Sequence, residues 1–353
     1  MRNMVFGMIS IGLILLIFSL SEKETPRSSF AQLFANTSDR ISDNDNEDHS
    51  SISMKTNLTT KITNTTLLKE PELPTQMLAG TQNDEIILNL LSQGIENKLE
   101  KIKSILEILS KLPEIKNLSY DSHVYTDTDG IPGIPSELDI EKRQIANYLL
   151  SEYSQDLVSV LFQLPNGDVY LLEPYERQQN LSASNLSFRD YYQGVIATND
   201  TFLGNIIISA SSGLKQVQLA VPLYKEDSFI NNNNNNNSNR ENSISGILST
   251  GLNLQSFDKM LGSANLTAVN NEGILLLDGN GIIIAGTNKN MTNLDDENET
   301  FTNMKSYKLA LNGKSGTIPE EIDEVLKSIT YSPVKAISNT WVLLLIKDYP
   351  TMK

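Results

Sequence analysis

The 353-residue chain contains no cysteine. This absence excludes disulfides, thiol nucleophiles, cysteine-ligated zinc and lipid attachment to an N-terminal cysteine. Histidine is nearly absent as well, because only His49, in a polar N-terminal region, and His123, in an expected loop, occur. Neither a histidine-rich metal site nor a Ser-His-Asp arrangement is expected. The sequence therefore predicts a protein that is not an enzyme and that uses no cofactor and no metal.

Positive charge is scarce too. Lysine and arginine number 28 against 43 acidic residues, and the formal net charge is -15. No basic run is available to neutralise phosphates, so nucleic acid is not an expected partner. Hydrophobic residues make up 39% of the chain, enough for a folded core. The length that remains after the N-terminal segments suits one large or two small domains.

Long apolar runs are absent except at the N-terminus, where no charge interrupts Met4 to Leu20. As a helix this run is roughly 26 Å long, close to the thickness of about 30 Å of a bilayer core. Arg2 precedes it and acidic residues follow, which favours a cytoplasmic N-terminus and an extracellular bulk. We expect residues 1–21 to be a signal anchor in the cell membrane. The alternative is a secreted protein, because Ser19 and Ser21 fit a signal-peptidase site.

Residues 22–80 are rich in Ser, Thr and Asn and show little apolar periodicity. Such a segment cannot bury enough surface to offset its ordering entropy, so a disordered tether is expected. The run 231–237 is expected to be a disordered hairpin tip. Asn-x-Ser/Thr triplets predict an exposed, glycosylated surface and occur at Asn36, Asn57, Asn64, Asn117, Asn180, Asn185, Asn199, Asn236, Asn265, Asn290 and Asn298.

A long helix is predicted over residues 81–113. Apolar residues recur there at spacings of three and four, Asp84 can cap the start, and Pro113 ends the pattern. The apolar face is wider than a strict coiled-coil seam, so we expect this helix to pack along the following domain. The alternative is that it forms the seam of a homodimer.

An internal repeat follows. Asn166-Gly167 joins two apolar runs in a predicted hairpin, and the same device returns at 274–285 around Gly279 and Gly281. A helix is predicted at 138–153 before the first hairpin. After that hairpin come a helix at 187–197 and strands at 202–211, 214–225 and 246–254; after the second come a helix at 301–311 and strands at 314–318, 324–334 and 341–348. The pattern predicts an α+β fold with two antiparallel five-stranded sheets and flanking helices.

The segment 187–193, Ser-Phe-Arg-Asp-Tyr-Tyr-Gln, places a guanidinium beside two phenol rings at the start of a predicted helix. An arginine fork binds a carboxylate with two hydrogen bonds, and aromatic faces can enclose the rest of a small ligand. Arg189, Tyr191 and Tyr192 are therefore the candidate binding residues. The alternative is that Arg189 pairs with Asp190 and that both tyrosines belong to the core.

Together the membrane segment, the long helix, the two sheet units and the Arg-x-Tyr-Tyr cluster make the chain similar to the double Cache family of extracellular sensors, over roughly residues 80–349. The resemblance implies two tandem PAS-like modules, a membrane-distal one at 114–262 that holds a ligand pocket and a membrane-proximal one at 263–349. It also implies that Arg189 grips a ligand carboxylate and that Tyr191 and Tyr192 enclose the ligand.

Two positions depart from the amino-acid-binding branch of that family. The acidic residue that would hold a ligand amine falls at Gly251, and an upstream tyrosine falls near Ser184. Amino-acid specificity is therefore left open, because an ammonium buried without an acid costs several kcal/mol. Acids that could take this role from another direction are Asp190, Glu173 and Asp200, and further candidate walls are Tyr170, Tyr175 and Phe202.

The expected function is extracellular sensing of an amino acid, an amine or a carboxylate. The chain has no second apolar run of membrane-spanning length, so no effector of its own is expected, and signalling would pass through a partner chain or a homodimer. The alternative is a surface or secreted interaction protein that keeps the fold without binding a ligand.

Overall fold

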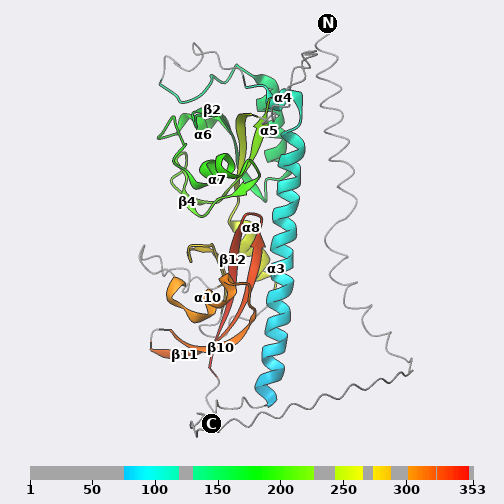
Figure 1. Ribbon diagram of the computed structural model, residues 1–353, viewed down its shortest axis with the longest axis vertical. Helices are drawn as coiled ribbons and strands as arrows, with labels where there is room; N and C mark the ends of the chain where they lie inside the picture. Colours follow the sequence, from blue (N-terminus) through cyan, green and yellow to red (C-terminus); the bar gives the residue numbers. More distant parts are fainter. Residues whose placement is uncertain are drawn as a thin grey trace, which may run out of the picture. The chain divides into compact units, whose positions relative to one another are not determined.

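The computed structural model (Figure 1) describes residues 75–118, 130–225, 243–264, 273–287, 301–322 and 324–349, with side chains from residue 82 onward. The expected signal anchor, most of the tether, the asparagine run and both histidines lie outside these residues. Within them, no helix is both long and apolar enough to cross a bilayer.

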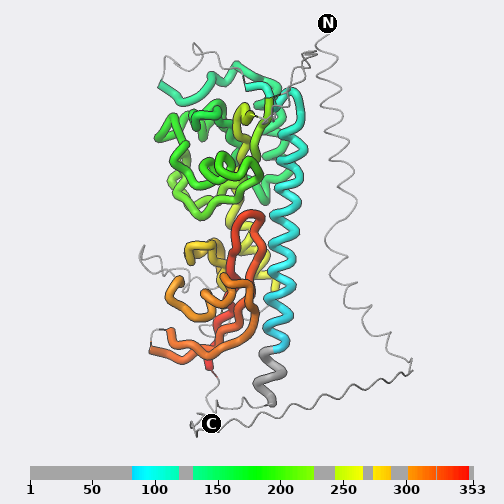
Figure 2. Tube along the Cα trace, viewed as in Figure 1, coloured from blue at the N-terminus to red at the C-terminus, as the bar shows by residue number. Residues whose placement is uncertain are grey.

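The long helix is α3, Thr75–Leu109, and a short helix α4, Pro113–Lys116, follows it. It begins earlier than predicted, directly after Pro74, so the expected capping role of Asp84 is wrong. Asp84 lies inside the helix and its carboxylate forms an ion pair with Lys347 at 2.7 Å. The apolar stripe is buried as predicted, at Leu88, Leu91, Ile95, Leu99, Ile102, Leu106 and Leu109. In Figures 1 and 2, α3 runs beside the strands of both modules.

The first module opens with helix α5, Ile140–Glu152. Its five-stranded antiparallel sheet has the order β2-β1-β7-β6-β3. The strands are β1 (Leu157–Gln163), β2 (Val169–Glu173), β3 (Phe202–Leu203), β6 (Gln218–Tyr224) and β7 (Ile244–Leu252). Helices α6 (Tyr175–Gln179) and α7 (Asp190–Thr198) lie between β2 and β3, and α8 (Gln255–Gly262) follows β7.

The second module repeats this arrangement. Its sheet has the order β9-β8-β12-β11-β10, so in both sheets the hairpin strands lie beside the last strand of the unit. The strands are β8 (Gly273–Leu277), β9 (Ile283–Gly286), β10 (Gly316–Ile322), β11 (Val325–Ala336) and β12 (Asn339–Asp348), and a 3-10 turn η1 (Phe301–Asn303) and α10 (Lys305–Leu311) precede β10. The predicted α+β fold with two five-stranded sheets is confirmed.

The prediction of two long continuous strands at 202–211 and 214–225 is wrong about their continuity. Each is interrupted, and residues 204–217 leave the sheet to form a separate two-stranded hairpin, β4 (Ile207–Ile208) with β5 (Lys215–Gln216). Asp190 explains the break, because its carboxylate accepts the Asn205 backbone N–H at 2.6 Å and so draws this residue away from the sheet ladder. The β4–β5 hairpin therefore lies over one face of the first sheet.

The two faces of the first sheet have different neighbours. Helices α3 and α5 pack on one face, where Val160, Phe162 and Leu171 are buried. On the other face, Leu161 and Ala220 form a cluster with residues of α7. The candidate site lies on this second face.

Candidate functional site

The first hairpin fixes where α7 begins. Gly167 has a φ of 89°, and a Cβ atom at this position would lie 2.8 Å from the backbone of Ser187, so only glycine allows this close approach. The Leu186 N–H donates to the Gly167 carbonyl at 2.9 Å, and Asn185 pairs with Asp168. The chain then turns into α7 at Arg189, which occupies the N-cap position.

Asp190 occupies the first turn of α7, where a carboxylate is favoured by the helix dipole. One carboxylate oxygen accepts the Tyr191 N–H at 2.8 Å, and the other accepts the backbone and side-chain N–H groups of Asn205. Asp190 thus ties the start of the helix to the segment that leads into the β4–β5 hairpin. The alternative reading, a pairing of Arg189 with Asp190, is not what the structure shows.

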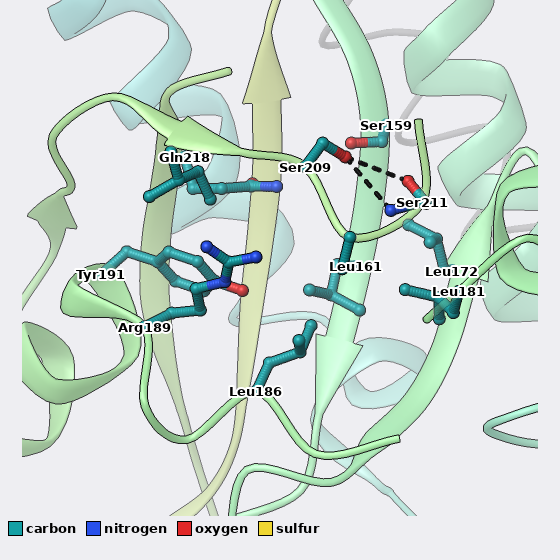
Figure 3. A pocket seen from close by; sticks show the side chains of 12 residues that line it. Ser159, Leu161, Leu172, Leu181, Leu186, Arg189, Tyr191, Ser209, Ser211 and Gln218 are labelled. Atoms are coloured by element: carbon teal, nitrogen blue, oxygen red, sulfur yellow. Dashed lines mark hydrogen bonds between the residues drawn. The ribbon is translucent and has the colours of Figure 1, made fainter. Parts of the chain in front are cut away.

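A cavity of about 20 Å³ lies between the first sheet, the start of α7 and the β4–β5 hairpin. A volume of this size accommodates one or two waters. It is lined by Ser159, Leu161, Leu172, Leu181, Leu186, Arg189, Tyr191, Ile207, Ser209, Ala210, Ser211 and Gln218. Figure 3 shows the leucines gathered on one side and Arg189 with Tyr191 on the other. Arg189 and Tyr191 are therefore brought together as the sequence predicted.

Arg189 supplies the only charge in this lining. Its Nη2 donates to the Ile208 carbonyl at 2.9 Å, and its guanidinium carbon lies 4.8 Å from the centre of the Phe188 ring. This is the single hydrogen bond that the guanidinium makes within the described part of the chain. Because a guanidinium carries five N–H donors, most of its capacity is available to a bound carboxylate.

Tyr191 is 1% exposed, and its ring belongs to the core cluster on this face. Burial raises the pKa of its hydroxyl, and the nearby Arg189 charge opposes that rise. In the part of the chain that the structure describes, this hydroxyl has no hydrogen-bond partner. The hydroxyl is thus a neutral donor at the cavity, ready to bond a ligand oxygen.

Two further polar groups on this face of the sheet are buried without a partner in the described structure: Oε1 of Gln218 and Oγ of Ser249. Gln218 is 7% exposed and lines the cavity. Buried polar atoms normally have a hydrogen-bond partner, and an unpartnered one costs about 1–3 kcal/mol. A ligand group that donates to Gln218 would remove part of that cost.

Gly251 lies between Ser159 and Gln218 in the sheet register, so all three share the cavity face. A Cβ atom at Gly251 would lie 1.4 Å from Nε2 of Gln216. The Gln216 amide, on β5, therefore fills the space that a side chain at position 251 would occupy, and it donates to Oγ of Ser159 at 3.1 Å. Ser184, at the other departure from the family pattern, is exposed.

Tyr192 and Phe202 lie beside the cavity without lining it. The Tyr192 hydroxyl donates to the Pro165 carbonyl at 2.6 Å, which ties α7 to the hairpin turn. Phe202 packs on α7 at Gly194, where a Cβ atom would meet the Phe202 ring at 2.3 Å. Both residues support the helix that carries Arg189 and Tyr191. Asp200 is exposed and its carboxylate accepts the Thr201 N–H.

Glu173, Tyr170 and Tyr175 contact groups other than the cavity. Glu173 alternates with the cavity residue Leu172 and so points to the opposite face, where it forms an ion pair with Arg143 at 2.5 Å. A register shift between Phe162 and Gln163 places Val169, rather than Tyr170, in the cavity-side cluster. The Tyr170 hydroxyl donates to Asp139 at 2.7 Å, and the Tyr175 ring lies 5.1 Å from the Arg143 guanidinium carbon.

Several cavity residues were not among the predicted site residues. Ser159, Leu161 and Gln218 lie on predicted strands, and the available signal was the polar residues Ser159 and Gln218 within otherwise apolar strand sequences. The residues of the β4–β5 hairpin had a weaker signal, the turn-forming sequence Ser211-Ser212-Gly213. Within the described residues no cluster of three or more histidines, aspartates or glutamates could hold a metal ion.

No family model and no curated protein matches the sequence. Solved structures do match. The ligand-binding domain of the Campylobacter jejuni chemoreceptor Tlp3, in complex with 4-methylisoleucine, has a TM-score of 0.51 at 17% identity, over 79% of this chain and 97% of that one. The same domain with L-norvaline gives the same four values. A Pseudomonas aeruginosa PAO1 amino-acid chemoreceptor domain, PctC with GABA, has a TM-score of 0.49 at 14% identity, over 76% and 99%.

The Tlp3 similarity covers 79% of this chain, more than either module alone. At this level of identity it establishes the architecture. The chain has the tandem PAS-like fold of the double Cache sensor domains, as its sequence resemblance predicted.

Proposed function

We propose that this chain binds a small organic molecule in the cavity between the first sheet and α7, and that it works as an extracellular sensory domain. The observation that carries the proposal is the lining of that cavity. The Arg189 guanidinium, the buried Tyr191 phenol and the unpartnered Gln218 amide oxygen meet there beside four leucines. Converging polar groups in an apolar hollow are the usual form of a small-molecule site.

The solved structures support the same reading. The Tlp3 domain, which shares this fold, is a chemoreceptor ligand-binding domain that was solved with 4-methylisoleucine and with L-norvaline. Within the broader set of amino acids, amines and carboxylates, Arg189 favours a ligand that carries a carboxylate. The proposal is of binding and assigns the chain no catalytic step.

The remaining parts of the proposal concern how the domain is attached to the membrane and how it signals. Residues 1–21 would anchor the chain in the cell membrane, with cleavage and secretion as the alternative. Signalling would pass through a partner chain or a second copy. A contact route from the cavity exists: Asp190 holds Asn205, and the adjacent Ile206 N–H donates to Asp278 of the second module at 3.1 Å.

One observation favours a second function, that of a surface or secreted interaction protein without a ligand. The cavity volume of about 20 Å³ has room for one or two waters, so a larger ligand requires the lining to open, for example where Ile207, Ser209, Ala210 and Ser211 of the β4–β5 hairpin cover it. In this alternative the hollow is a packing defect of a fold that has lost its ligand.

A ligand screen separates the two functions. The purified full chain is heated with amino acids, amines, carboxylates and purines, and its thermal midpoint is followed, because a ligand of the native state raises that midpoint by mass action. The sensor proposal expects at least one hit that Arg189→Ala abolishes. A matched control is Lys225→Ala, which removes one exposed positive charge in the same module and leaves the shift intact. No shift with any compound favours the interaction protein.

A further inference from the structure

We infer that the ligand is a short aliphatic carboxylate whose second polar group is uncharged, such as a 2-hydroxy acid, and is not an α-amino acid. This inference rests on the proposed function and narrows it to one chemical class. It follows from the charges around the cavity, from the group that fills the space above Gly251, and from the unpartnered oxygen of Gln218.

The charge of the cavity is positive only. Among the described residues no aspartate or glutamate lines it, and Arg189 is its one ionised group. The two nearest acids of the sequence-predicted site are engaged elsewhere. Asp190 accepts hydrogen bonds from Tyr191 and Asn205, and Glu173 pairs with Arg143 on the opposite face of the sheet. Once Arg189 has paired with a ligand carboxylate, a buried ammonium on the same ligand would have no acid as its partner and would be strongly disfavoured.

The position at which the double Cache resemblance implies an acid for a ligand amine is Gly251, and the space above it is filled by a neutral group. Gln216 is 3% exposed, and its amide occupies the space that a side chain at Gly251 would take. This amide is held by Oγ of Ser159 at 3.1 Å. Neither this amide nor the Ser159 hydroxyl, which lines the cavity, carries a negative charge, so a polar but uncharged ligand substituent fits beside Ser159.

The other cavity groups fit the proposed ligand. Arg189 and the Tyr191 hydroxyl can donate to the two oxygens of a carboxylate. Oε1 of Gln218, buried and without a partner among the described residues, can accept a hydrogen bond from a ligand hydroxyl. Leu161, Leu172, Leu181 and Leu186 form the apolar side, which suits a short branched chain and excludes a second charge.

The test compares three probes with the same branched side chain on the full chain by titration calorimetry: (S)-2-hydroxyisovalerate, L-valine and isobutylamine. The first two differ only in a hydroxyl against an ammonium, and the third lacks the carboxylate. We expect 2-hydroxyisovalerate to bind, L-valine to bind at least about tenfold more weakly, and isobutylamine not to bind, because an uncompensated buried ammonium costs more than one tenfold step.

A variant reverses the preference. Gln216→Glu replaces the side-chain amide by a carboxylate of the same shape. The added negative charge should strengthen L-valine binding and weaken 2-hydroxyisovalerate binding, each by at least about tenfold. The matched control is Gln255→Glu, the same substitution at an exposed position of α8, which should leave both affinities within about twofold.

The outcomes distinguish this inference from the proposed function. If wild type binds L-valine as tightly as 2-hydroxyisovalerate, or binds neither carboxylate, the ligand class is wrong. If an amino acid or amine binds instead and Arg189→Ala abolishes that binding, the sensor proposal stands with another ligand class. If no compound of the broader screen binds either, the sensor proposal fails as well.

Discussion

The adjacent residues Tyr191 and Tyr192 are both buried, yet their hydroxyls have different surroundings. The Tyr192 hydroxyl donates to the Pro165 carbonyl, and the Tyr191 hydroxyl meets the cavity. Tyr192→Phe should therefore lower the free energy of unfolding by about 1 kcal/mol at pH 7. Tyr191→Phe should leave it nearly unchanged, while weakening any ligand that bonds the hydroxyl. Urea denaturation measures both, and equal losses of stability would contradict this division of roles.

Alkaline pH gives a second test of Tyr191. Burial raises the pKa of its hydroxyl above the value in the unfolded chain, so the folded state holds this proton more tightly. Its contribution is complete below the unfolded pKa of about 10 and is lost as pH rises above that value. Wild type should lose more stability between pH 8 and pH 11 than Tyr191→Phe does. Chemical denaturation at the two pH values measures this loss. An equal loss in free energy of unfolding for wild type and Tyr191→Phe would contradict the expectation.

Arg143 and Glu173 form the buried ion pair on the far face of the sheet, with side chains 6% and 4% exposed. Arg143→Met should lower the free energy of unfolding by about 3–5 kcal/mol, because it leaves the Glu173 carboxylate buried without its partner. The control Glu141→Ala, an exposed neighbour on α5, should stay within about 0.5 kcal/mol. A loss below about 1 kcal/mol for Arg143→Met would show that the pair contributes little.

At the residue scale the structure brings Arg189 and Tyr191 together at one cavity, because their spacing at a helix start is a local property, and their role in ligand binding stays a prediction. It did not predict which way Tyr170 and Glu173 point. Their faces depend on a one-residue register shift in the hairpin and on strand alternation, and a shift of one residue exchanges the two faces of a strand. Gln216 was missed because its role comes from a contact with Gly251, which is distant in sequence.

At the element scale, α3 is stabilised by one buried stripe along its length. Leu99 is fully buried and Leu90 is 42% exposed on the same helix. Leu99→Ala should lower the free energy of unfolding by about 2–5 kcal/mol, through lost burial and the cavity that remains. Leu90→Ala is the matched control, expected to cost less than about 1 kcal/mol. Equal costs in chemical denaturation would mean that α3 does not pack on the modules as described.

Elements with strong local signals were predicted well, including both hairpins and the long helix. The Asn-Gly turn and the three-four spacing are set by a few neighbouring residues. The interruption of the strands at 204–217 was not predicted, because it results from the bond between Asp190 and Asn205. Helices α6 and α8 were also missed, since both are short, with 5 and 8 residues, and α8 packs on β9, a strand further along the chain.

At the scale of the whole molecule, the two modules and α3 belong to one compact unit, Leu73–Lys353. The modules meet at Leu203, whose N–H donates to Oγ of Ser338 at 2.9 Å. Ser338→Ala removes this acceptor and should lower the free energy of unfolding by about 1–3 kcal/mol, because Leu203 is fully buried.

The control for this change is Ser104→Ala, at a hydroxyl that bonds only within its own helix, where stability should be unchanged or slightly higher. Differential scanning calorimetry follows both variants. If Ser338→Ala leaves the unfolding transition unaltered, the junction between the modules does not depend on this bond.

The tandem architecture could be predicted at this scale because the two hairpins and the strands after them repeat along the sequence. The ligand could not be predicted from the sequence, because the cavity combines residues from three separate segments. They are Arg189 at the start of α7, Gln218 on β6 and Ser209 in the β4–β5 hairpin. These segments are brought together only by the sheet order and by the departure of residues 204–217 from the sheet.

The most direct test of a ligand cavity built on Arg189 is a calorimetric titration of the tightest compound from the screen into wild type and into Arg189→Ala. Loss of two charge-assisted hydrogen bonds to a carboxylate should weaken binding by at least about tenfold and by up to several hundredfold. Lys225→Ala should bind like wild type. An unchanged Kd for Arg189→Ala would contradict the account, because the ligand would then lie somewhere other than between the first sheet and α7.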